Sequence, residues 1–124
     1  MRLTGAAVAL VAALGATSAS AAELPRHAYA QALAAVEAGQ WQLAATRLSF
    51  ALRVDPVPHA RVRLYGMHYV DYVPAHLAGL VAAELGDCPA ALAGVNDPAT
   101  ARLVAESVAE SAQRAHVLDR CRNH

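Results

Sequence analysis

Lysine is absent from the sequence, and all ten basic residues are arginine. Arginine presents a planar fork of donors that suits phosphate and carboxylate groups, but the codon bias of a GC-rich genome is the simpler explanation. An excess of charge is also absent, since the formal net charge is +0. Loss of Arg2 with an N-terminal leader would leave nine basic and ten acidic residues. We therefore expect neither nucleic acid nor an anionic lipid surface as a partner.

Aromatic residues are scarce as well, at 5% of the chain, although 56% of its residues are hydrophobic. Alanine makes up most of the difference, and it favours helix while supplying little packing volume. The composition therefore predicts an all-α fold of slim, closely packed helices. Without a leader, the chain has the length of about one small domain, which we assign to residues 23–124.

Motifs that carry chemistry are missing too. No histidine pairs with a second one at i, i+3 or i, i+4 as in a helical metal site. The sequence holds no Gly-x-Ser-x-Gly turn, no paired carboxylates framed for acid–base work and no phosphate-binding glycine loop. We therefore expect no metal, no cofactor and no catalytic activity. The histidines are His27, His59, His68, His76, His116 and His124.

Residues 1–22 have the three-part layout of a secretory signal peptide. Arg2 supplies a positive start, residues 6–14 form an apolar stretch, and small residues follow. This order predicts cleavage after Ala21 or after Ala22. The apolar stretch is much shorter than the ~20 residues of a spanning helix. We therefore expect a periplasmic or secreted protein with no membrane span after signal cleavage.

Apolar spacing predicts a first pair of helices. The run from Tyr29 to Val36 repeats at helical intervals and ends at Gly39, where a left-handed residue can cap a helix. A second helix is predicted over residues 41–52 and stops before Pro56 and Pro58, which cannot continue it. Because the link between them is short, the two helices should pack antiparallel.

A second pair of helices is predicted from Pro74, a residue favoured in a first turn. Apolar residues recur at helical spacing until Gly86 ends the run. Asp87 is a good N-cap for the next helix, which ends before Asn96-Asp97-Pro98.

The final helix is predicted over residues 98–122, and it closes the stack. One stripe is apolar and the opposite side polar, as expected of a helix that packs with a single face. The apolar stripe comprises Val104, Val108, Ser111, Ala115 and Leu118. The polar side comprises Arg102, Glu106, Glu110, Gln113 and Arg120.

Residues 57–73 differ from the helical segments on either side, because apolar and polar residues alternate around Gly66. Period two predicts a short two-stranded hairpin or an extended loop, and both remain open. Arginine and tyrosine are enriched at interface hot spots, so we expect this segment to contact a partner. The alternative is that its tyrosines cover the helical pairs as extra core. The candidate contact residues are Arg61, Arg63, Tyr69 and Tyr72.

The two helix–turn–helix segments have similar turns. Gly39-Gln40-Trp41-Gln42-Leu43-Ala44 aligns with Gly86-Asp87-Cys88-Pro89-Ala90-Ala91. In each, a bulky or buried side chain comes two residues after glycine, and alanine comes five residues after it. This order resembles the tetratricopeptide (TPR) repeat, and Pro56 stands at the closing proline of that repeat. The likeness covers about residues 29–95, and it extends to repeat proteins exported by bacteria.

The chain also departs from the repeat. Gly39 and Gly86 lie about 47 residues apart, against a TPR period of about 34, so residues 57–73 are an insertion of roughly 13 residues. Cys88 stands where the family has an aromatic residue. The resemblance gives Gly79 a packing role only, since small residues let helices approach closely.

In the TPR family, ligands lie in a concave groove lined by the first helix of each unit. The resemblance therefore implies that residues on these helices bind a partner. The alternative is that they form ordinary solvated helix faces. The groove positions are Arg26, Tyr29 and Glu37 in the first unit, and His76 and Glu84 in the second.

Cys88 and Cys121 would meet oxidising conditions in an exported protein, so a disulfide is the natural expectation. A straight helix over residues 98–122 would carry Cys121 about 22 Å past Cys88, too far for a bond. The bond therefore requires a bend, and Ser107 with Glu110 has the spacing of a capping box where a helix can restart. Two free thiols and a bond between chains remain alternatives.

Together these patterns predict an exported protein–protein interaction module, a TPR-like adaptor or scaffold with no catalytic activity of its own. Its expected partner is another protein of the cell envelope. Repeat stacks usually need about three units, so a homo-oligomer or the partner would complete the core. The alternative is a small ligand-binding or enzyme-inhibitor protein that uses residues 61–72.

Overall fold

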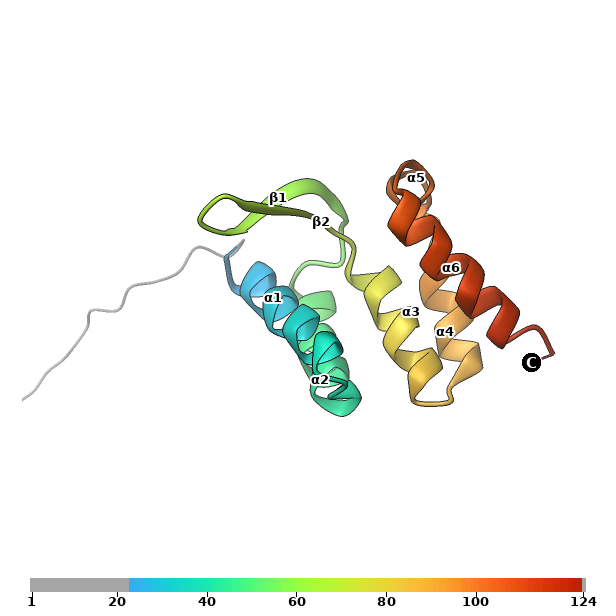
Figure 1. Cartoon of the computed structure of the whole chain (residues 1–124). Helices are drawn as coiled ribbons and strands as arrows, with labels where there is room; N and C mark the ends of the chain where they lie inside the picture. The colour runs from blue at the N-terminus through green and yellow to red at the C-terminus, as the bar shows by residue number, and fades with distance from the viewer. Residues whose placement is uncertain (1–22, 124) are drawn as a thin grey trace, which may run out of the picture.

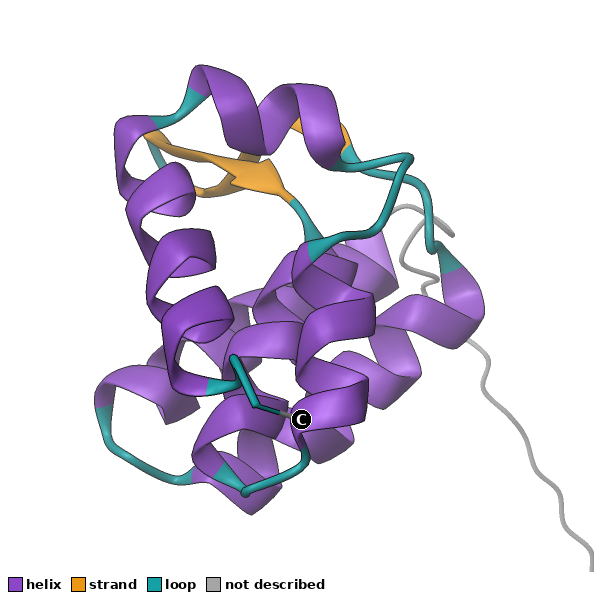
Figure 2. Cartoon of the chain, turned by 90° about the vertical axis from the view of Figure 1, so that its right-hand side faces the viewer, coloured by secondary structure: helices purple, strands orange, loops and turns teal. Residues whose placement is uncertain are grey.

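The computed structural model describes residues 23–123, so the predicted leader lies outside the described residues. These residues form six helices and one two-stranded antiparallel sheet, which makes the fold mostly helical. Figure 1 shows two helical hairpins side by side, with the sheet at one end of them. Figure 2, turned by 90°, shows the sheet at the same end.

The first helical hairpin consists of α1 (Glu23–Glu37) and α2 (Trp41–Val54). Helix α1 begins at Glu23, earlier than the Tyr29 start predicted from apolar spacing. Gly39 takes a φ of +71°, and its N–H donates to the Val36 carbonyl at 3.0 Å, which confirms the left-handed cap. Alanine dominates the contact between these helices. The buried residues of the pair include Ala28, Ala32, Ala35, Ala44, Leu48 and Ala51.

Strands β1 (His59–Tyr65) and β2 (His68–Tyr72) form an antiparallel hairpin, so the two-stranded prediction is confirmed. Gly66 turns the chain between them with a φ of +51°. Alternation places Val62 and Tyr72 in the core, whereas Tyr65 is 65% exposed. The Tyr72 hydroxyl donates to the Asp55 carbonyl at 2.7 Å and so anchors the sheet to the end of α2.

The second helical hairpin consists of α3 (Pro74–Glu84) and α4 (Cys88–Val95). The N-cap prediction for Asp87 is confirmed, since its Oδ1 accepts from the Ala90 N–H at 3.1 Å. Two glycines bring α3 and α4 into close contact. A Cβ added to Gly79 would lie 2.8 Å from the Ala91 carbonyl oxygen, and one added to Gly94 would lie 2.6 Å from the Gly79 Cα.

The predicted single helix over residues 98–122 is wrong, because the chain forms α5 (Ala101–Glu106) and α6 (Val108–Arg120). Ser107 separates them in an extended conformation, and its Oγ accepts from the Glu110 N–H at 3.1 Å. The restart at Ser107 changes which residues face inward. Val108 is 90% exposed, whereas Val117 is 1% exposed, so the predicted apolar stripe is wrong at Val108 and Ala115, although Val104 is buried and Leu118 packs against the core.

A disulfide joins Cys88 at the start of α4 to Cys121 at the end of α6, with their Cα atoms 5.5 Å apart. The break at Ser107 supplies the bend that this bond requires, because α6 no longer continues the direction of α5. Val117 and Val95 pack with the disulfide in one core cluster. The second and larger cluster includes residues of α1, α2, α3 and the sheet. Among the described helices, none is long and apolar enough to cross a membrane.

Candidate functional site

A groove of about 360 Å³ opens between α1, α3 and α6, and we call it the α1–α3–α6 groove. Its floor is apolar, and Trp41 at the start of α2 lies beside it. Polar residues of α3 and α6 stand at its rim. The lining comprises Val36, Trp41, Leu80, Ala83, Glu84, Ala112, Gln113, His116 and Val117.

Three interactions hold α6 in place as one wall of this groove. The Cys88–Cys121 bond fixes its C-terminal end. Arg120 donates to Glu84 of α3 at 2.9 Å, close to the same end. About two turns earlier in α6, the Gln113 Oε1 accepts from the His76 Nε2 at 3.0 Å. Helix α6 is therefore joined to both α3 and α4.

Tyr29 and Tyr72 pack against each other inside the protein, with ring centroids 5.0 Å apart. The Tyr29 hydroxyl donates to the Asp71 carbonyl at 3.2 Å, which links α1 to β2. Burial raises the pKa of Tyr29 above its ordinary value and raises the pKa of Tyr72 to about 12. Both hydroxyls therefore stay protonated and serve as structural hydrogen-bond donors.

Two ionisable side chains are shielded from solvent to different degrees, since His76 of α3 is buried and Glu110 of α6 is partly buried. His76 is 1% exposed, and burial lowers the pKa of its imidazole, so the ring is neutral near pH 7. Burial raises the pKa of the Glu110 carboxyl, and the charge of Asp71 raises it further. Within the described chain, His76 Nδ1 and Glu110 Oε1 are buried atoms without a hydrogen-bond partner.

Three of the predicted contact residues are covered by the protein itself. Tyr29, Tyr72 and His76 are at most 3% exposed, so they belong to the core and not to a solvent-facing groove wall. The expectation that Tyr29 and His76 line an open groove was therefore incorrect, because helix phase alone does not show which face a later segment covers. For Tyr72, the alternative that tyrosines of the insertion serve as core is confirmed.

The remaining predicted contact residues lie on the surface in separate places. Glu84 stands at the rim of the α1–α3–α6 groove and pairs with Arg120. Glu37 lines a hollow between α1 and the β-hairpin. Arg61 is stacked over the Tyr69 ring at 5.6 Å on the exposed part of the hairpin.

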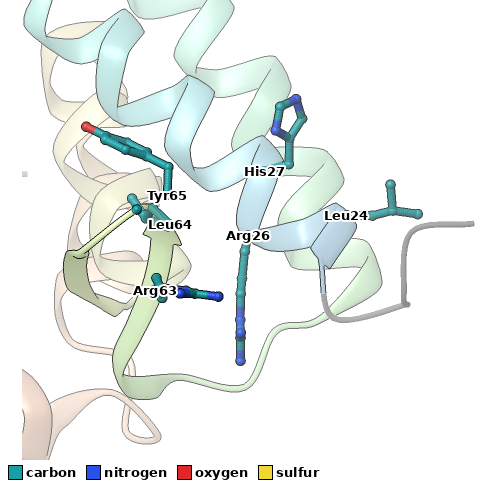
Figure 3. Close-up of a pocket in the computed structure, with 7 residues that line it drawn as sticks. Leu24, Arg26, His27, Arg63, Leu64 and Tyr65 are labelled. Atoms are coloured by element: carbon teal, nitrogen blue, oxygen red, sulfur yellow. The ribbon is translucent and has the colours of Figure 1, made fainter.

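Arg26 and Arg63 are brought together, although about 37 residues separate them in the sequence. They line a second pocket, of about 600 Å³, between the start of α1 and the β-hairpin. Figure 3 shows both arginine side chains extending into the same space from α1 and β1. We call this the α1–hairpin pocket. Its lining comprises Leu24, Arg26, His27, Arg63, Leu64, Tyr65 and Gly66.

Most of the α1–α3–α6 groove was not predicted as a site. Val36 and Trp41 were predicted only as apolar helix positions, and His116 only as an unremarkable histidine. The possible restart at Ser107 was one available signal, because a helix that begins at Val108 presents other positions to α3 than a continuous helix over residues 98–122 would. A lone tryptophan at a helix start was a second signal, since tryptophan is enriched at binding surfaces.

The part of the chain that the structure describes holds no group of three or more His, Cys, Asp or Glu side chains that could bind a metal ion. Comparisons of the chain with protein-family models, with curated proteins and with solved structures each returned no match. The functional argument therefore depends on the two concave surfaces and their chemistry.

Proposed function

We propose that this protein is an exported TPR-like adaptor that binds a segment of another envelope protein in the α1–α3–α6 groove. The arrangement of the helices supports the TPR-like assignment. Helix α2 packs on α3, so the two helical hairpins stack in sequence order. Helix α6 packs on both α3 and α4, as the first helix of a third unit would.

The apolar groove is the observation that carries the proposal. Val36 and Leu80 are partly exposed and leave apolar surface open to solvent, and the buried Ala83 lies beneath them. A partly exposed tryptophan next to polar side chains is typical of a protein-binding surface. The groove suits a short helical or extended peptide whose apolar side chains cover this floor.

Export is supported by the Cys88–Cys121 bond, because disulfides persist in oxidising compartments. The leader prediction is tested by expressing the full sequence in a bacterium and measuring the mass of the extracytoplasmic product. The expected N-terminus is Ala22 or Glu23. A product that keeps residues 1–22 would contradict the cleavage prediction.

Photo-crosslinking tests the groove. A photoreactive amino acid at position 116 lies in the groove, whereas one at position 115 lies on exposed surface of α6 outside it. In envelope extract, we expect a specific protein adduct at position 116 and none at position 115. If a second copy of the chain fills the groove, the photoreactive residue at position 116 would crosslink the two copies into a dimer. Equal labelling at both positions, with a monomer in light scattering, would contradict the adaptor proposal.

Charge placed in the groove should block binding. Ala112→Glu puts a carboxylate among apolar residues, whereas Ala115→Glu adds the same charge elsewhere on α6. Both alanines are exposed, so neither change disturbs the core. We expect loss of the adduct at position 116 with Ala112→Glu and retention with Ala115→Glu.

Trp41 is the only tryptophan of the chain, so its fluorescence reports occupation of the groove directly.

A further inference from the structure

The α1–hairpin pocket places two guanidinium groups in one hollow. Arg26 comes from α1 and Arg63 from β1, and their side chains enter the same space (Figure 3). His27 of α1 is also part of the lining, although its ring points away from the two guanidinium groups (Figure 3). Every residue that lines the pocket is basic, apolar, aromatic or glycine, so no carboxylate belongs to the lining.

Asp55 and Asp71, two acidic residues near this end of the chain, are engaged elsewhere. The Asp55 carboxylate accepts from His59 Nε2 at 2.9 Å and from the Val57 N–H at 3.1 Å. The Asp71 carboxylate accepts from the Arg61 N–H at 3.0 Å. Among the residues whose side chains the structure describes, which do not include Glu23, no ion pair includes Arg26 or Arg63. Two guanidinium groups that share a hollow repel each other, and the attraction of both groups to a bound anion would offset that repulsion.

The rest of the lining is apolar or aromatic. Leu24 is 47% exposed and Tyr65 is 65% exposed, and Leu64 of β1 is partly buried against the core. A bare inorganic ion would leave these surfaces uncovered. A volume of about 600 Å³ falls within the range of small-molecule sites. The chemistry therefore matches an anion attached to an apolar body.

We propose that the α1–hairpin pocket binds a carboxylate carried by an apolar group, with Arg26 and Arg63 holding the carboxylate and Leu64 and Tyr65 covering the apolar part. Guanidinium groups bind carboxylates through two parallel hydrogen bonds, which gives both strength and orientation. The carboxylate comes from a small organic acid or from the C-terminus of a peptide. This site lies outside the α1–α3–α6 groove, so it stands independently of the adaptor proposal.

Calorimetry with the protein expressed from its full sequence tests the site. The probes are octanoate, phenylbutyrate, a short peptide ending in leucine with a free carboxylate, and the same peptide with an amidated end. We expect saturable binding of at least one carboxylate probe and none of the amidated peptide. Binding of octanoate or phenylbutyrate identifies a small organic acid, whereas binding only of the free peptide identifies a C-terminus.

Variants assign the binding to the two arginines. Arg26→Gln and Arg63→Gln should each weaken binding by about tenfold or more, since each removes charge-assisted hydrogen bonds. Arg26→Lys and Arg63→Lys keep the charge but lose the planar fork, and they should show intermediate binding. Arg102→Gln makes the same change in charge on exposed α5 and should leave binding unaltered.

Three outcomes would overturn the proposal: no saturable binding of any carboxylate probe, equal loss of binding with Arg102→Gln, or inorganic phosphate binding as tightly as the carboxylates.

The Trp41 fluorescence separates the two sites. A ligand of the α1–hairpin pocket should leave it unchanged, whereas a ligand of the α1–α3–α6 groove should shift it.

Discussion

The His76 Nε2 on α3 donates to the Gln113 Oε1 on α6 at 3.0 Å, and this bond crosses the interior between two helices that are far apart in sequence. His76 is 1% exposed, and its Nδ1 has no hydrogen-bond partner within the described chain. Protonation would therefore place an imidazolium in the core without an acceptor at Nδ1. The neutral imidazole is therefore favoured in the folded state.

Acidification should destabilise the fold through His76. Its pKa is lowered in the folded state, mainly by burial, so the unfolded chain binds the proton first as pH falls below about 6.5. The neutral His76 therefore contributes to the free energy of unfolding above that pH, and this contribution is lost as the pH falls. The loss at pH 5.5 is no more than about 1.4 kcal/mol. Urea unfolding at pH 7.5 and 5.5 should show a smaller pH dependence in His76→Gln than in wild type.

The control for this prediction is His116→Gln, which removes an exposed histidine from the same region. His116→Gln should keep the wild-type pH dependence. If His76→Gln and His116→Gln changed it equally, the buried histidine would not be the group responsible.

Removal of the Glu110 charge should stabilise the fold at neutral pH. The pKa of Glu110 is raised by burial and by Asp71, so its charged form is disfavoured in the folded state. Stability is lost as pH rises through the range where Glu110 ionises. Because the carboxyl remains partly solvated, we expect Glu110→Gln to raise Tm by only about 1–3 °C at pH 7.5. The gain should disappear near pH 4.

Glu106→Gln is the matched control, because the Glu106 carboxylate is exposed and lies 3.9 Å from Arg102. It should change Tm little. A gain for Glu110→Gln that persists at pH 4 would show that packing, and not charge, is responsible.

Loss of the Cys88–Cys121 bond should destabilise the fold strongly. The two residues are 33 apart in the sequence, and closing such a loop stabilises a fold by about 3.5–4 kcal/mol in the chain-entropy model. We expect the double variant Cys88→Ala/Cys121→Ala to lose about that much in urea unfolding. Mass measurement before and after reduction tests the bond itself. A mass unchanged by reduction, with both thiols open to alkylation, would contradict it.

Side chains added at the contact between α3 and α4 should be poorly tolerated. A Cβ at Gly94 would lie 2.6 Å from the Ala75 carbonyl oxygen, and backbone atoms cannot move away as a flexible side chain does. We expect Gly94→Ala to cost at least about 2–3 kcal/mol in the free energy of unfolding. Gly66→Ala meets nothing within 4 Å at a φ of +51°, so it should cost only about 1 kcal/mol. Equal effects would contradict the close contact.

Local signals in the sequence were sufficient for most element boundaries. The cap at Gly39 and the N-caps at Asp87 and Ser107 each depend on a few neighbouring residues. Alternation around Gly66 likewise predicted the hairpin, although it could not exclude an extended loop. The TPR-like assignment, the export signal and the adaptor function stay predictions.

The sites were harder to predict than the elements. Arg26 and Arg63 were proposed separately, and neither position indicates in sequence that the two side chains share one pocket. Tyr29 was assigned to an open helix face, yet β2 covers it. The phase of α6 was misjudged because one extended residue, Ser107, rotates every position that follows it.

The sequence by itself determined most turns and caps, because caps, prolines and alternation act over one or two turns of chain, but not the start of α1 or the break at Ser107. Its alanine-rich composition also indicated slim, closely packed helices. Only the tertiary structure decided which faces are covered, which arginines meet, and that Cys88 reaches Cys121. Those outcomes depend on the packing of segments distant in sequence, whose relative positions no local pattern encodes.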